Sequence, residues 1–276
     1  MDGRGFREFV ADFGSDREPG GAGPADRVVV SRIDSTNRLA RRVVATYAAE
    51  ETSPPHFLVL AYEQTAGRGR QGRGWTSPRG CGVYATRVLP LSGGVDDLQS
   101  LPLLAGAGLA RGLEVLLRRG TSDSRARLKW PNDLLIDGRK AGGVLTESLA
   151  LGSGPPVALI GFGVNHLRPR EGPELPPGAT CLGDHLDEPP PLGEVARELV
   201  AALEAELAHL GDLRHAVAAF RELSVHRPGD PLRCRVGGEV VEGELAGFDD
   251  RGHLVLRQGA DRVRIAAGEI VEENEP

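Results

Sequence analysis

Leu128-Lys-Trp-Pro-Asn-Asp-Leu-Leu-Ile-Asp-Gly-Arg-Lys140 contains both lysines of this 276-residue chain, and the other 31 of its 33 basic residues are arginines. Arginine supplies a general positive charge, so a position that remains lysine is a candidate for needing a compact ammonium group. Apolar segments at 127–130, 134–136 and 144–146, with Asp137-Gly138 between the last two, predict antiparallel strands joined by a tight turn. The stretch therefore predicts part of a sheet and a candidate site together.

Strands and helices alternate on both sides of this stretch. On its N-terminal side, the pattern predicts strands at 28–33, 57–61 and 83–89 and a helix at 98–118. Asp34-Ser35-Thr36 offers capping side chains ahead of an apolar stripe with helical spacing. On its C-terminal side, a buried strand at 157–164 precedes amphipathic helices at about 193–210 and 212–223. This order predicts a domain that mixes helices with one sheet.

The texture of the sequence changes twice, which predicts three parts. Residues 1–25 are rich in Gly, Asp, Glu and Arg, and we expect a flexible tail because they hold too little apolar area to order themselves. Residues 26–227 form the main domain. Beyond Pro228-Gly229-Asp230-Pro231 the strands become short and are separated by turn residues, which predicts a small barrel over residues 228–276.

Composition argues against several classes of protein. Apolar segments such as 157–164 are far shorter than a membrane span, and the N-terminus lacks the apolar core of a secretory signal, so we expect a cytoplasmic protein without a membrane partner. Cys81, Cys181 and Cys234 are too widely spaced for a metal site, which predicts reduced thiols and no structural zinc. The net charge of −6 (33 − 39) gives no general sign of a nucleic-acid partner.

The most distinctive loop is Gln64-Thr-Ala-Gly-Arg-Gly-Arg-Gln-Gly-Arg-Gly-Trp75. Gly67, Gly69 and Gly72 match the spacing of a dinucleotide fingerprint, but no helix follows directly and no acidic residue occurs between Glu63 and Asp96. A Rossmann site is therefore disfavoured. Glycine backbone beside three arginines and an aromatic ring suits a nucleotide phosphate or another polyanion. The alternative is an RGG-like element that binds RNA without sequence specificity.

Polar side chains gather at two points of the lysine-bearing stretch. Asn132 and Asp133 follow a rigid Trp-Pro turn and offer an amide and a carboxylate for Mg²⁺ or an incoming amine, with an ordinary Asx turn as the alternative. Lys140 follows the predicted turn, and Ala141-Gly142-Gly143 leaves room for a ligand beside it. A lysine there neutralises charge on a phosphoryl group, and an exposed turn residue is the alternative. Lys129 is expected to serve the strand and turn.

Five motifs, taken in order, resemble the signature of the biotin protein ligases, also called biotin-[acetyl-CoA-carboxylase] ligases. They are Asp34-Ser-Thr-Asn37, Gly67-Arg-Gly-Arg70 with Gln71-Gly-Arg-Gly-Trp75, Lys129-Trp-Pro-Asn-Asp133, Arg139-Lys-Ala-Gly-Gly143 and Ile160-Gly-Phe-Gly-Val-Asn165. Their order and spacing match over about residues 30–270, and five motifs in register are far more specific than any single one. The resemblance implies an α+β fold, in which a mixed β-sheet packed with helices carries the site and a small C-terminal SH3-like barrel follows.

The resemblance also implies a two-step reaction. Biotin and Mg·ATP give biotinyl-5′-adenylate and pyrophosphate, and a lysine of a biotin carboxyl carrier domain then attacks the adenylate. On this chain, Lys140 is expected to bridge the biotin carboxylate and the α-phosphate as the main electrostatic catalyst, with Arg68 as a second catalytic residue. Asp133 is expected to orient Mg²⁺ or the acceptor amine.

The remaining site residues are implied in two groups. Biotin is expected to contact Ser35, Thr36, Asn37, Gln64, Gly67, Arg68, Gly69, Arg70, Lys140 and Gly143, with the two hydroxyls and Gln64 at its ureido group. ATP and the adenylate are expected to contact Arg68, Arg70, Trp75, Asn132, Lys140 and Asn165, with Asn165 at the adenine. Since Ser35 and Thr36 also stand where a helix begins, capping is an alternative role for them.

One departure from the family matters. Members that also repress biotin genes carry an N-terminal winged helix-turn-helix, and about 25 residues are too few for one, so we expect a monofunctional ligase without specific DNA binding. Three alternatives stay open. They are a lipoate or other carboxylic-acid ligase of the same fold, an RNA-binding module that uses the arginine loop, and a pseudoenzyme that stores biotin, against which the intact Lys140 argues.

Overall fold

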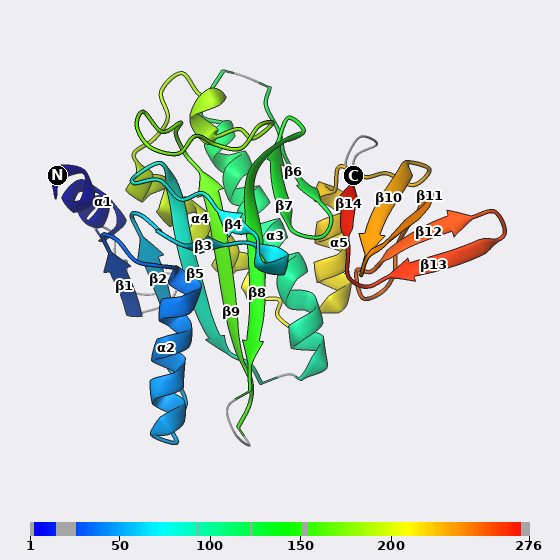
Figure 1. Ribbon diagram of the computed structural model, residues 1–276, viewed down its shortest axis with the longest axis horizontal. Helices are drawn as coiled ribbons and strands as arrows, with labels where there is room; N and C mark the ends of the chain where they lie inside the picture. The colour runs from blue at the N-terminus through cyan, green and yellow to red at the C-terminus, as the bar shows by residue number, and fades with distance from the viewer. Residues whose placement is uncertain (1–2, 15–25, 93, 122, 151–153, 272–276) are drawn as a thin grey trace.

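A seven-stranded mixed sheet forms the centre of the computed structural model, which describes residues 3–14, 26–92, 94–121, 123–150 and 154–271 (Figure 1). The strand order is β1-β2-β5-β9-β8-β7-β6, in which β1 runs parallel to β2 and the other pairs are antiparallel. The strands are β1 (Asp26–Val30), β2 (Phe57–Ala61), β5 (Gly82–Pro90), β6 (Ala126–Lys129), β7 (Asp133–Ile136), β8 (Arg139–Leu149) and β9 (Val157–Asn165).

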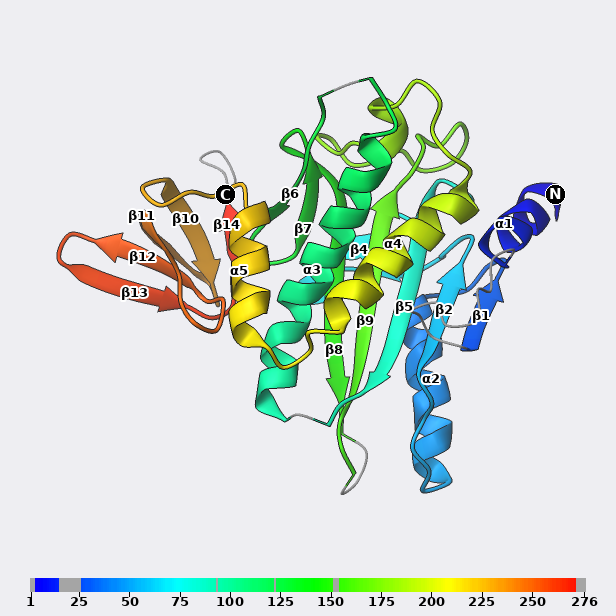
Figure 2. The same cartoon turned by 180° about the vertical axis from the view of Figure 1, so that it is seen from behind.

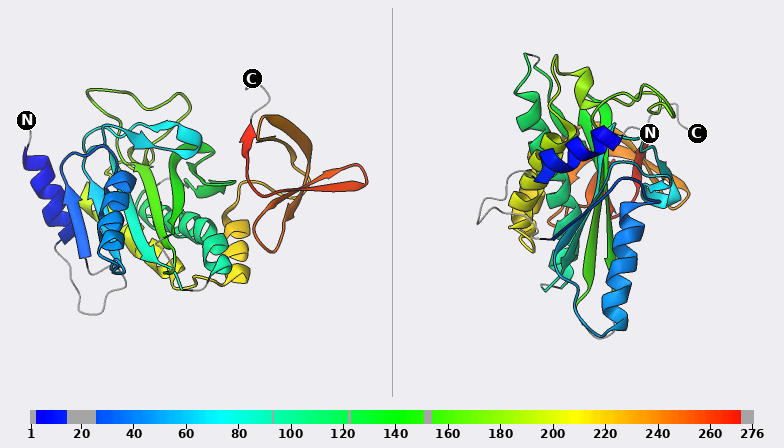
Figure 3. Two further views of the ribbon diagram at one scale, coloured as in Figure 1. Left: turned by 60° about the horizontal axis from the view of Figure 1, so that its bottom comes forward. Right: turned by 90° about the vertical axis from the view of Figure 1, so that its left-hand side faces the viewer.

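Helices cover both faces of this sheet, as the edge-on view in Figure 3 shows. α2 (Thr36–Ala49) lies on one face, while α3 (Val95–Leu117) and α4 (Leu192–Leu207) cross the other, with α5 (Leu213–Leu223) beside α3 (Figure 2). Because both faces are covered, the residues of β2 and β9 are buried along the whole strand and read as continuous apolar runs. The predicted α+β class, with a mixed sheet packed by helices, is confirmed.

α3 is the central helix of the hydrophobic core. It packs so closely on α4 that a Cβ atom on Gly108 would lie 2.8 Å from the Leu203 Cα, which requires glycine at this position. α3 is also the one helix in the described ranges that is long and apolar enough to cross a membrane, and the sequence analysis overlooked it. Since 83% of its most apolar window is buried inside the protein, its composition is that of a core helix.

The lysine-bearing stretch folds as the antiparallel unit that was predicted, at the sheet edge farthest from β1. Asp137 and Gly138 have φ values of 48° and 77°, and these two left-handed residues make the tight turn between β7 and β8. The pairing then shifts, because Leu134 lies opposite Gly142 whereas Leu135 lies opposite Lys140, so Ala141 is the extra residue of a β-bulge. The bulge re-aims the strand directly beside Lys140.

The N-terminal segment differs from its prediction. Residues Gly3–Gly14 form α1, so the expected flexible tail is wrong for this part, whereas residues 15–25 lie outside the described ranges. Phe9 is only 3% exposed, and the rings of Phe6 and Phe9 lie 5.9 and 5.6 Å from the ring of Tyr62. The two phenylalanines are three residues apart and share one helix face, and the high glycine and charge content concealed that pattern.

A second, smaller sheet follows the main domain and lies to one side of it (Figure 3). Its order is β13-β12-β11-β10-β14, all antiparallel, and within residues 231–271 no hydrogen bonds between β13 and β14 close it into a barrel. The predicted boundary at 227/228 lies between α5 and β10. The strands are β10 (Pro231–Val236), β11 (Glu239–Phe248), β12 (Leu254–Gln258), β13 (Asp261–Ile265) and β14 (Glu269–Val271).

Candidate active site

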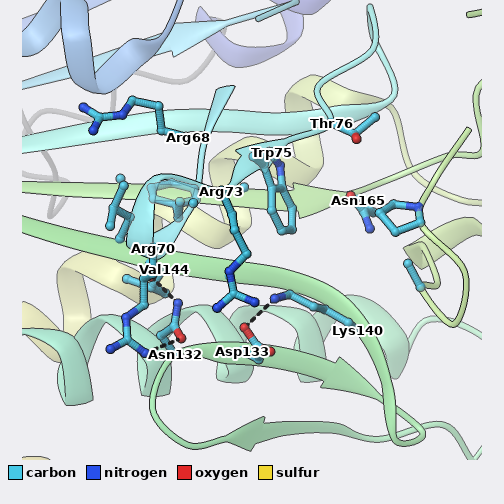
Figure 4. Close-up of a pocket in the computed structure, with 18 of the residues that line it drawn as sticks. Arg68, Arg70, Arg73, Trp75, Thr76, Asn132, Asp133, Lys140, Val144 and Asn165 are labelled. Carbon is cyan, nitrogen blue, oxygen red and sulfur yellow. Dashed lines mark hydrogen bonds and ion pairs between the residues drawn. The ribbon is translucent and has the colours of Figure 1, made fainter. Parts of the chain in front are cut away.

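A cavity of about 620 Å³ lies between the glycine-rich loop, the β7–β8 hairpin and β9, and Figure 4 shows its polar side chains. This volume falls in the range of small-molecule sites. Gly67 is the one residue of the predicted set that does not line the cavity. The others do, namely Ser35, Thr36, Asn37, Gln64, Arg68, Gly69, Arg70, Trp75, Asn132, Asp133, Lys140, Gly143 and Asn165.

An ion pair between Lys140 and Asp133 lies at the cavity wall, with 2.6 Å between Nζ and Oδ1. The two residues come from neighbouring strands of the hairpin, and the Lys140 and Asp133 side chains remain 43% and 23% exposed. The Lys140 ammonium also lies 5.8 Å from the centre of the Trp75 ring. Lys140 is therefore a partly solvated point charge that faces a ligand-sized space, and the exposed-turn alternative does not describe it.

Asn132 bridges the hairpin and the glycine-rich loop. Its Nδ2 donates to the Val144 carbonyl at 2.7 Å, and its Oδ1 accepts from Arg70 Nη1 at 3.3 Å. The amide is therefore occupied across the sheet and toward the loop, in a way that an isolated Asx turn does not require.

The glycine-rich loop is a small hairpin of β3 (Gly67–Arg68) and β4 (Gly74–Trp75), joined by a short 3₁₀ turn over Arg70–Gly72. A Cβ on Gly67 would lie 2.4 Å from the Trp75 carbonyl oxygen, so Gly67 allows the two strands to pack instead of lining the cavity. The Gly69 amide donates to the Arg73 carbonyl at 2.8 Å and closes the turn.

The arginines of this loop point in different directions (Figure 4). Arg68 is exposed and points away from the Lys140–Asp133 pair, so the geometry does not support the catalytic role expected for it. Arg70 donates to Asn132 and, at 3.2 Å, to the Gly268 carbonyl of the small domain. Burial lowers the pKa of Arg70, while Asp133 and Glu269 oppose that shift. Arg70 is thus the arginine held closest to the anionic side of the site.

Arg73 joins the loop to the small domain by a two-pronged ion pair. Its Nη1 and Nη2 each lie 2.7 Å from a carboxylate oxygen of Glu269, the first residue of β14. The hydrogen bonds from Arg73 lower the pKa of Glu269 and keep it ionised. Both residues line the cavity, so the small domain contributes directly to the site.

Trp75 forms one wall of the cavity across two glycines of the sheet. A Cβ on Gly163 would lie 2.3 Å from Trp75 Nε1, and one on Gly143 would lie 3.8 Å from Cζ3, so the indole rests where Gly163 supplies no side chain. Trp75 Nε1 is buried and has no hydrogen-bond partner among the described residues. A buried indole donor of this kind is available to an acceptor on a ligand.

The start of α2 forms the opposite end of the cavity. Ser35 is the N-cap residue of α2 and is 2% exposed, yet its side chain makes no capping hydrogen bond. Gln64 Oε1 accepts from the Thr36 amide at 2.9 Å and from the Thr36 hydroxyl at 3.2 Å. The capping alternative is therefore wrong for the Ser35 hydroxyl, while Thr36 and Gln64 hold each other in place.

Asn37 has a different position from its neighbours. Its Oδ1 accepts from Thr86 at 2.5 Å, and its Nδ2 donates to Glu147 at 2.9 Å. Both ends of the amide are thus occupied beneath the cavity, and this arrangement supports a role in building the pocket.

Asn165 ends β9 and faces a segment that the sequence analysis did not single out. Its Nδ2 donates to the Thr180 carbonyl at 2.9 Å, while the Thr180 amide donates to the Lys140 carbonyl at 2.9 Å. Residues 175–179 line the cavity beside them. Thr180 therefore connects the backbone of Lys140 to the side chain of Asn165.

Three parts of the site were missed from the sequence. Arg73 was noted in the loop but given no role, Glu269 lies in an ordinary strand of the small domain, and residues 175–179 have no motif around them. Charge complementarity offered a weak signal for Arg73, because the loop has three arginines and no acidic residue of its own. Nothing local indicates Glu269, since its partner lies 196 positions away.

The residues of the cavity fit a magnesium ion only as part of a metal–nucleotide complex. Among the described residues no group of three or more His, Cys, Asp and Glu side chains has the arrangement of a metal site. Asp133 and Glu269 are the carboxylates that line the cavity, and both are paired with cations. Mg²⁺ commonly takes one or two carboxylates together with substrate phosphates, and Asp133 satisfies that requirement.

Known proteins with the same sequence pattern and fold identify the family. The biotin/lipoate A/B protein ligase family matches residues 29–165, and the biotin protein ligase C-terminal domain matches residues 232–271. A biotin–[acetyl-CoA-carboxylase] ligase of Paracoccus denitrificans is 33% identical over 250 residues, which cover 88% of this chain and 98% of the relative.

Solved structures agree. The biotin protein ligase of Aquifex aeolicus in complex with biotin and ATP has a TM-score of 0.69 at 24% identity and shares the fold over 90% of this chain and 98% of its own. The biotin protein ligase of Leishmania major in complex with biotinyl-5-AMP has a TM-score of 0.58 at 25% identity, over 88% of this chain and 100% of its own. The chain belongs to the biotin protein ligases, within the biotin/lipoate A/B protein ligase family.

Proposed function

We propose that this chain is an ATP-dependent biotin–[biotin carboxyl carrier protein] ligase. In the first step a biotin carboxylate oxygen attacks the α-phosphorus of ATP, which forms biotinyl-5′-AMP and releases pyrophosphate. In the second step the amine of a carrier lysine attacks the biotinyl carbonyl and AMP leaves. The observation that carries the proposal is the Lys140 ammonium, held 2.6 Å from Asp133 at the wall of a cavity of about 620 Å³ in a chain of this family.

Lys140 is proposed as the electrostatic catalyst of the first step. The attack brings a carboxylate and a phosphate together, so mutual repulsion of two anions is the main obstacle and little proton transfer is needed. An ammonium between them lowers that repulsion, and the partial exposure of Lys140 lets it exchange Asp133 for the incoming anions. Arg70 adds a second cation on the same side of the cavity, since its guanidinium is directed toward Asn132 near the pair.

The apolar bicycle and ureido group of biotin suit the α2 end of the cavity. The Ser35 hydroxyl is not used as a helix cap, so it is available to a ureido oxygen or N–H. Thr36 and Gln64 are proposed to support the same group, with Gln64 fixed by Thr36 and by Ser77 at 2.9 Å. Biotin then extends under the glycine-rich loop toward Lys140, with Gly143 and Trp75 beside it.

The adenylate is proposed to occupy the side of the cavity between Asn165 and Trp75. The Asn165 Oδ1 is left to face a nucleotide, because Nδ2 is committed to Thr180, and the Trp75 indole offers a flat face and a buried N–H. Asp133 is released when Lys140 turns to the anions, and it is then placed to orient the ammonium or amine of the carrier lysine. Mg²⁺ bound to ATP would be held by Asp133 and would neutralise phosphate charge.

The experiment that tests this function is biotin-dependent exchange of pyrophosphate with ATP. We expect exchange that needs biotin and is not restored by lipoate, followed by covalent labelling of one lysine on a biotin carboxyl carrier domain. Exchange with lipoate in place of biotin would overturn the substrate and support the related carboxylic-acid ligase. Activity of either kind also separates the chain from a pseudoenzyme that only stores biotin.

The site geometry argues against the RNA-binding alternative. Arg70 and Arg73 are committed to Asn132, Gly268 and Glu269, so the loop does not present three free guanidinium groups to a phosphate backbone. We also propose a cytoplasmic protein without a DNA or membrane partner. Specific binding of operator DNA in a gel shift at physiological salt would overturn that part, because electrostatic binding alone is weak under these conditions.

A further inference from the structure

A buried polar cluster lies behind the cavity and plays no part in the reaction described above. Its centre is His185, whose side chain is 11% exposed and follows the short 3₁₀ turn Leu182–Asp184. His185 Nδ1 lies 3.1 Å from the Ser124 hydroxyl and 3.4 Å from Asp137 Oδ2, and its Nε2 lies 2.9 Å from the Thr180 hydroxyl. The cluster therefore joins the β7–β8 turn to the segment beside Asn165.

The hydrogens of this cluster can be assigned by counting donors. The Ser124 hydroxyl lies 2.7 Å from Asp137 Oδ2, and the Thr180 hydroxyl lies 2.9 Å from Asp184 Oδ2. Each hydroxyl has one hydrogen, and an ionised carboxylate accepts only, so both hydrogens belong to the carboxylates. His185 must then donate from Nδ1 toward Ser124 and Asp137, and from Nε2 to Thr180. Either neutral tautomer would leave one of these contacts between two acceptors.

The charged groups around the ring agree with an imidazolium. Burial by itself raises the pKa of Asp137, but the Ser124 hydroxyl, the Arg125 amide and the charge of His185 hold it below its ordinary value. Burial likewise raises the pKa of Asp184, but hydrogen bonds from Arg168, Thr180 and Cys181 hold it at about 2. Two carboxylates thus face the ring, and the nearby cations Arg125 and Arg168 are each bonded to a partner of their own.

The cluster reaches the site through Thr180. The Thr180 amide donates to the Lys140 carbonyl and its carbonyl accepts from Asn165, so the position of Thr180 determines where the adenine side of the cavity lies relative to Lys140. The preceding residue is held as well, because the Ala179 carbonyl accepts from Arg139 Nη2 at 2.7 Å. The side chain of Thr180 is anchored in turn by His185 and Asp184.

We propose that His185 is a positioning residue for the nucleotide, and that it acts as an imidazolium which ties Thr180 to the Asp137 turn. The proposal rests on the proposed function, because it assigns the Asn165 side of the cavity to ATP. His185 contacts neither substrate, since it acts through Thr180. Loss of its charge frees Thr180 and weakens ATP binding, whereas biotin binds at the α2 end and is unaffected.

Nuclear magnetic resonance tests the protonation state on the unmodified protein. Two-dimensional ¹H–¹⁵N spectra of the histidine rings, with His185 assigned from His185→Gln, are expected to show hydrogens on both ring nitrogens at pH 7. A neutral His185 ring at pH 7 would overturn the proposal. This measurement needs no enzymatic activity, so it stands apart from the test of the proposed function.

Kinetics of the His185→Gln variant test the positioning role. Glutamine retains a donor for Thr180 but loses the charge and the second donor, so we expect the KM for ATP to rise about ten-fold, the effect of one charge-assisted hydrogen bond. The KM for biotin is expected to change less than two-fold. In the unmodified enzyme the KM for ATP rises with pH as His185 loses its proton, and this rise is absent from His185→Gln.

The matched control is His209→Gln, because His209 lies on the surface after α4, where it stacks on His215 with 3.8 Å between ring centres. Equal increases of both KM values in His185→Gln would mean general loosening and would overturn the proposal. If biotin-dependent exchange is absent altogether, the proposed function fails. Calorimetric titration of both proteins with ATP then decides the role of His185, and equal affinity in the two would refute it.

Discussion

Replacement of Lys140 by arginine separates a point charge from a general positive charge. The ion pair with Asp133 joins side chains that are 43% and 23% exposed, and pairs of this kind contribute about 0–1 kcal/mol to folding. Arginine also pairs with carboxylates, so the melting temperature is expected to fall by no more than about 4 °C. The fold should therefore survive the change.

Catalysis should not survive it. The Lys140 Nζ lies 2.6 Å from a carboxylate oxygen, and a compact ammonium fits between two anions at such distances, whereas a planar guanidinium extends across them. Loss of a well-placed electrostatic group typically lowers kcat by about 10² to 10³. Pyrophosphate exchange at saturating biotin and ATP measures this loss, and Lys129→Arg is the matched comparison with an expected change below about three-fold. Turnover of Lys140→Arg within three-fold of the unmodified enzyme would refute the assignment.

Three further predictions follow from the loop and from a buried histidine. Arg70→Ala should release biotinyl-5′-AMP faster than Arg68→Ala, because Arg70 bonds to Asn132 and Gly268 whereas Arg68 points away; equal dissociation rates would contradict this. Glu269→Gln removes the partly exposed ion pair with Arg73 and should speed adenylate release by about two- to five-fold at low salt, less at high salt, as measured by tryptophan fluorescence; an unchanged rate would mean that the small domain does not hold the loop. Burial lowers the pKa of His166 to about 4, so the unfolded chain takes up this proton first and stability should fall as the pH decreases from about 6.5 toward 4. Urea unfolding at pH 7 and pH 5 measures that loss, about 2 kcal/mol for this group, and His166→Gln should show a smaller loss than the unmodified protein.

The elements around the site were predictable because periodicity and turn chemistry agreed locally. The strand at 57–61 was found with its bounds, and the Asp137-Gly138 turn adopts the left-handed conformations that its residue types favour. The flexible tail was wrong for the opposite reason. Average composition hid a short helix whose two phenylalanines find their partner, Tyr62, only in the folded protein.

The site itself was predictable as a set of motifs but not as a network. Motifs report which residue types occur close together in the chain, so they found the loop, the hairpin and the end of β9. They carry no information on contacts such as Arg73 with Glu269, whose energy depends on how two domains meet. The direction of Arg68 was equally hidden, because the φ value of 55° at Gln71 and the β3–β4 pairing decide which arginines turn inward.

The two lysines show how far a compositional argument reaches. Lys129 and Lys140 both line the cavity, but Lys129 ends β6 opposite Asp133 and also borders a second cavity against the small domain, whereas Lys140 forms the ion pair with Asp133. Scarcity of lysine selected the right hairpin because arginine had replaced lysine elsewhere. It was unable to separate the two, since their difference arises from the bulge at Ala141 and from the anchoring of Thr180 to the Lys140 backbone. The catalytic assignment therefore depends on the geometry that fixes Lys140, which includes His185 at its far end.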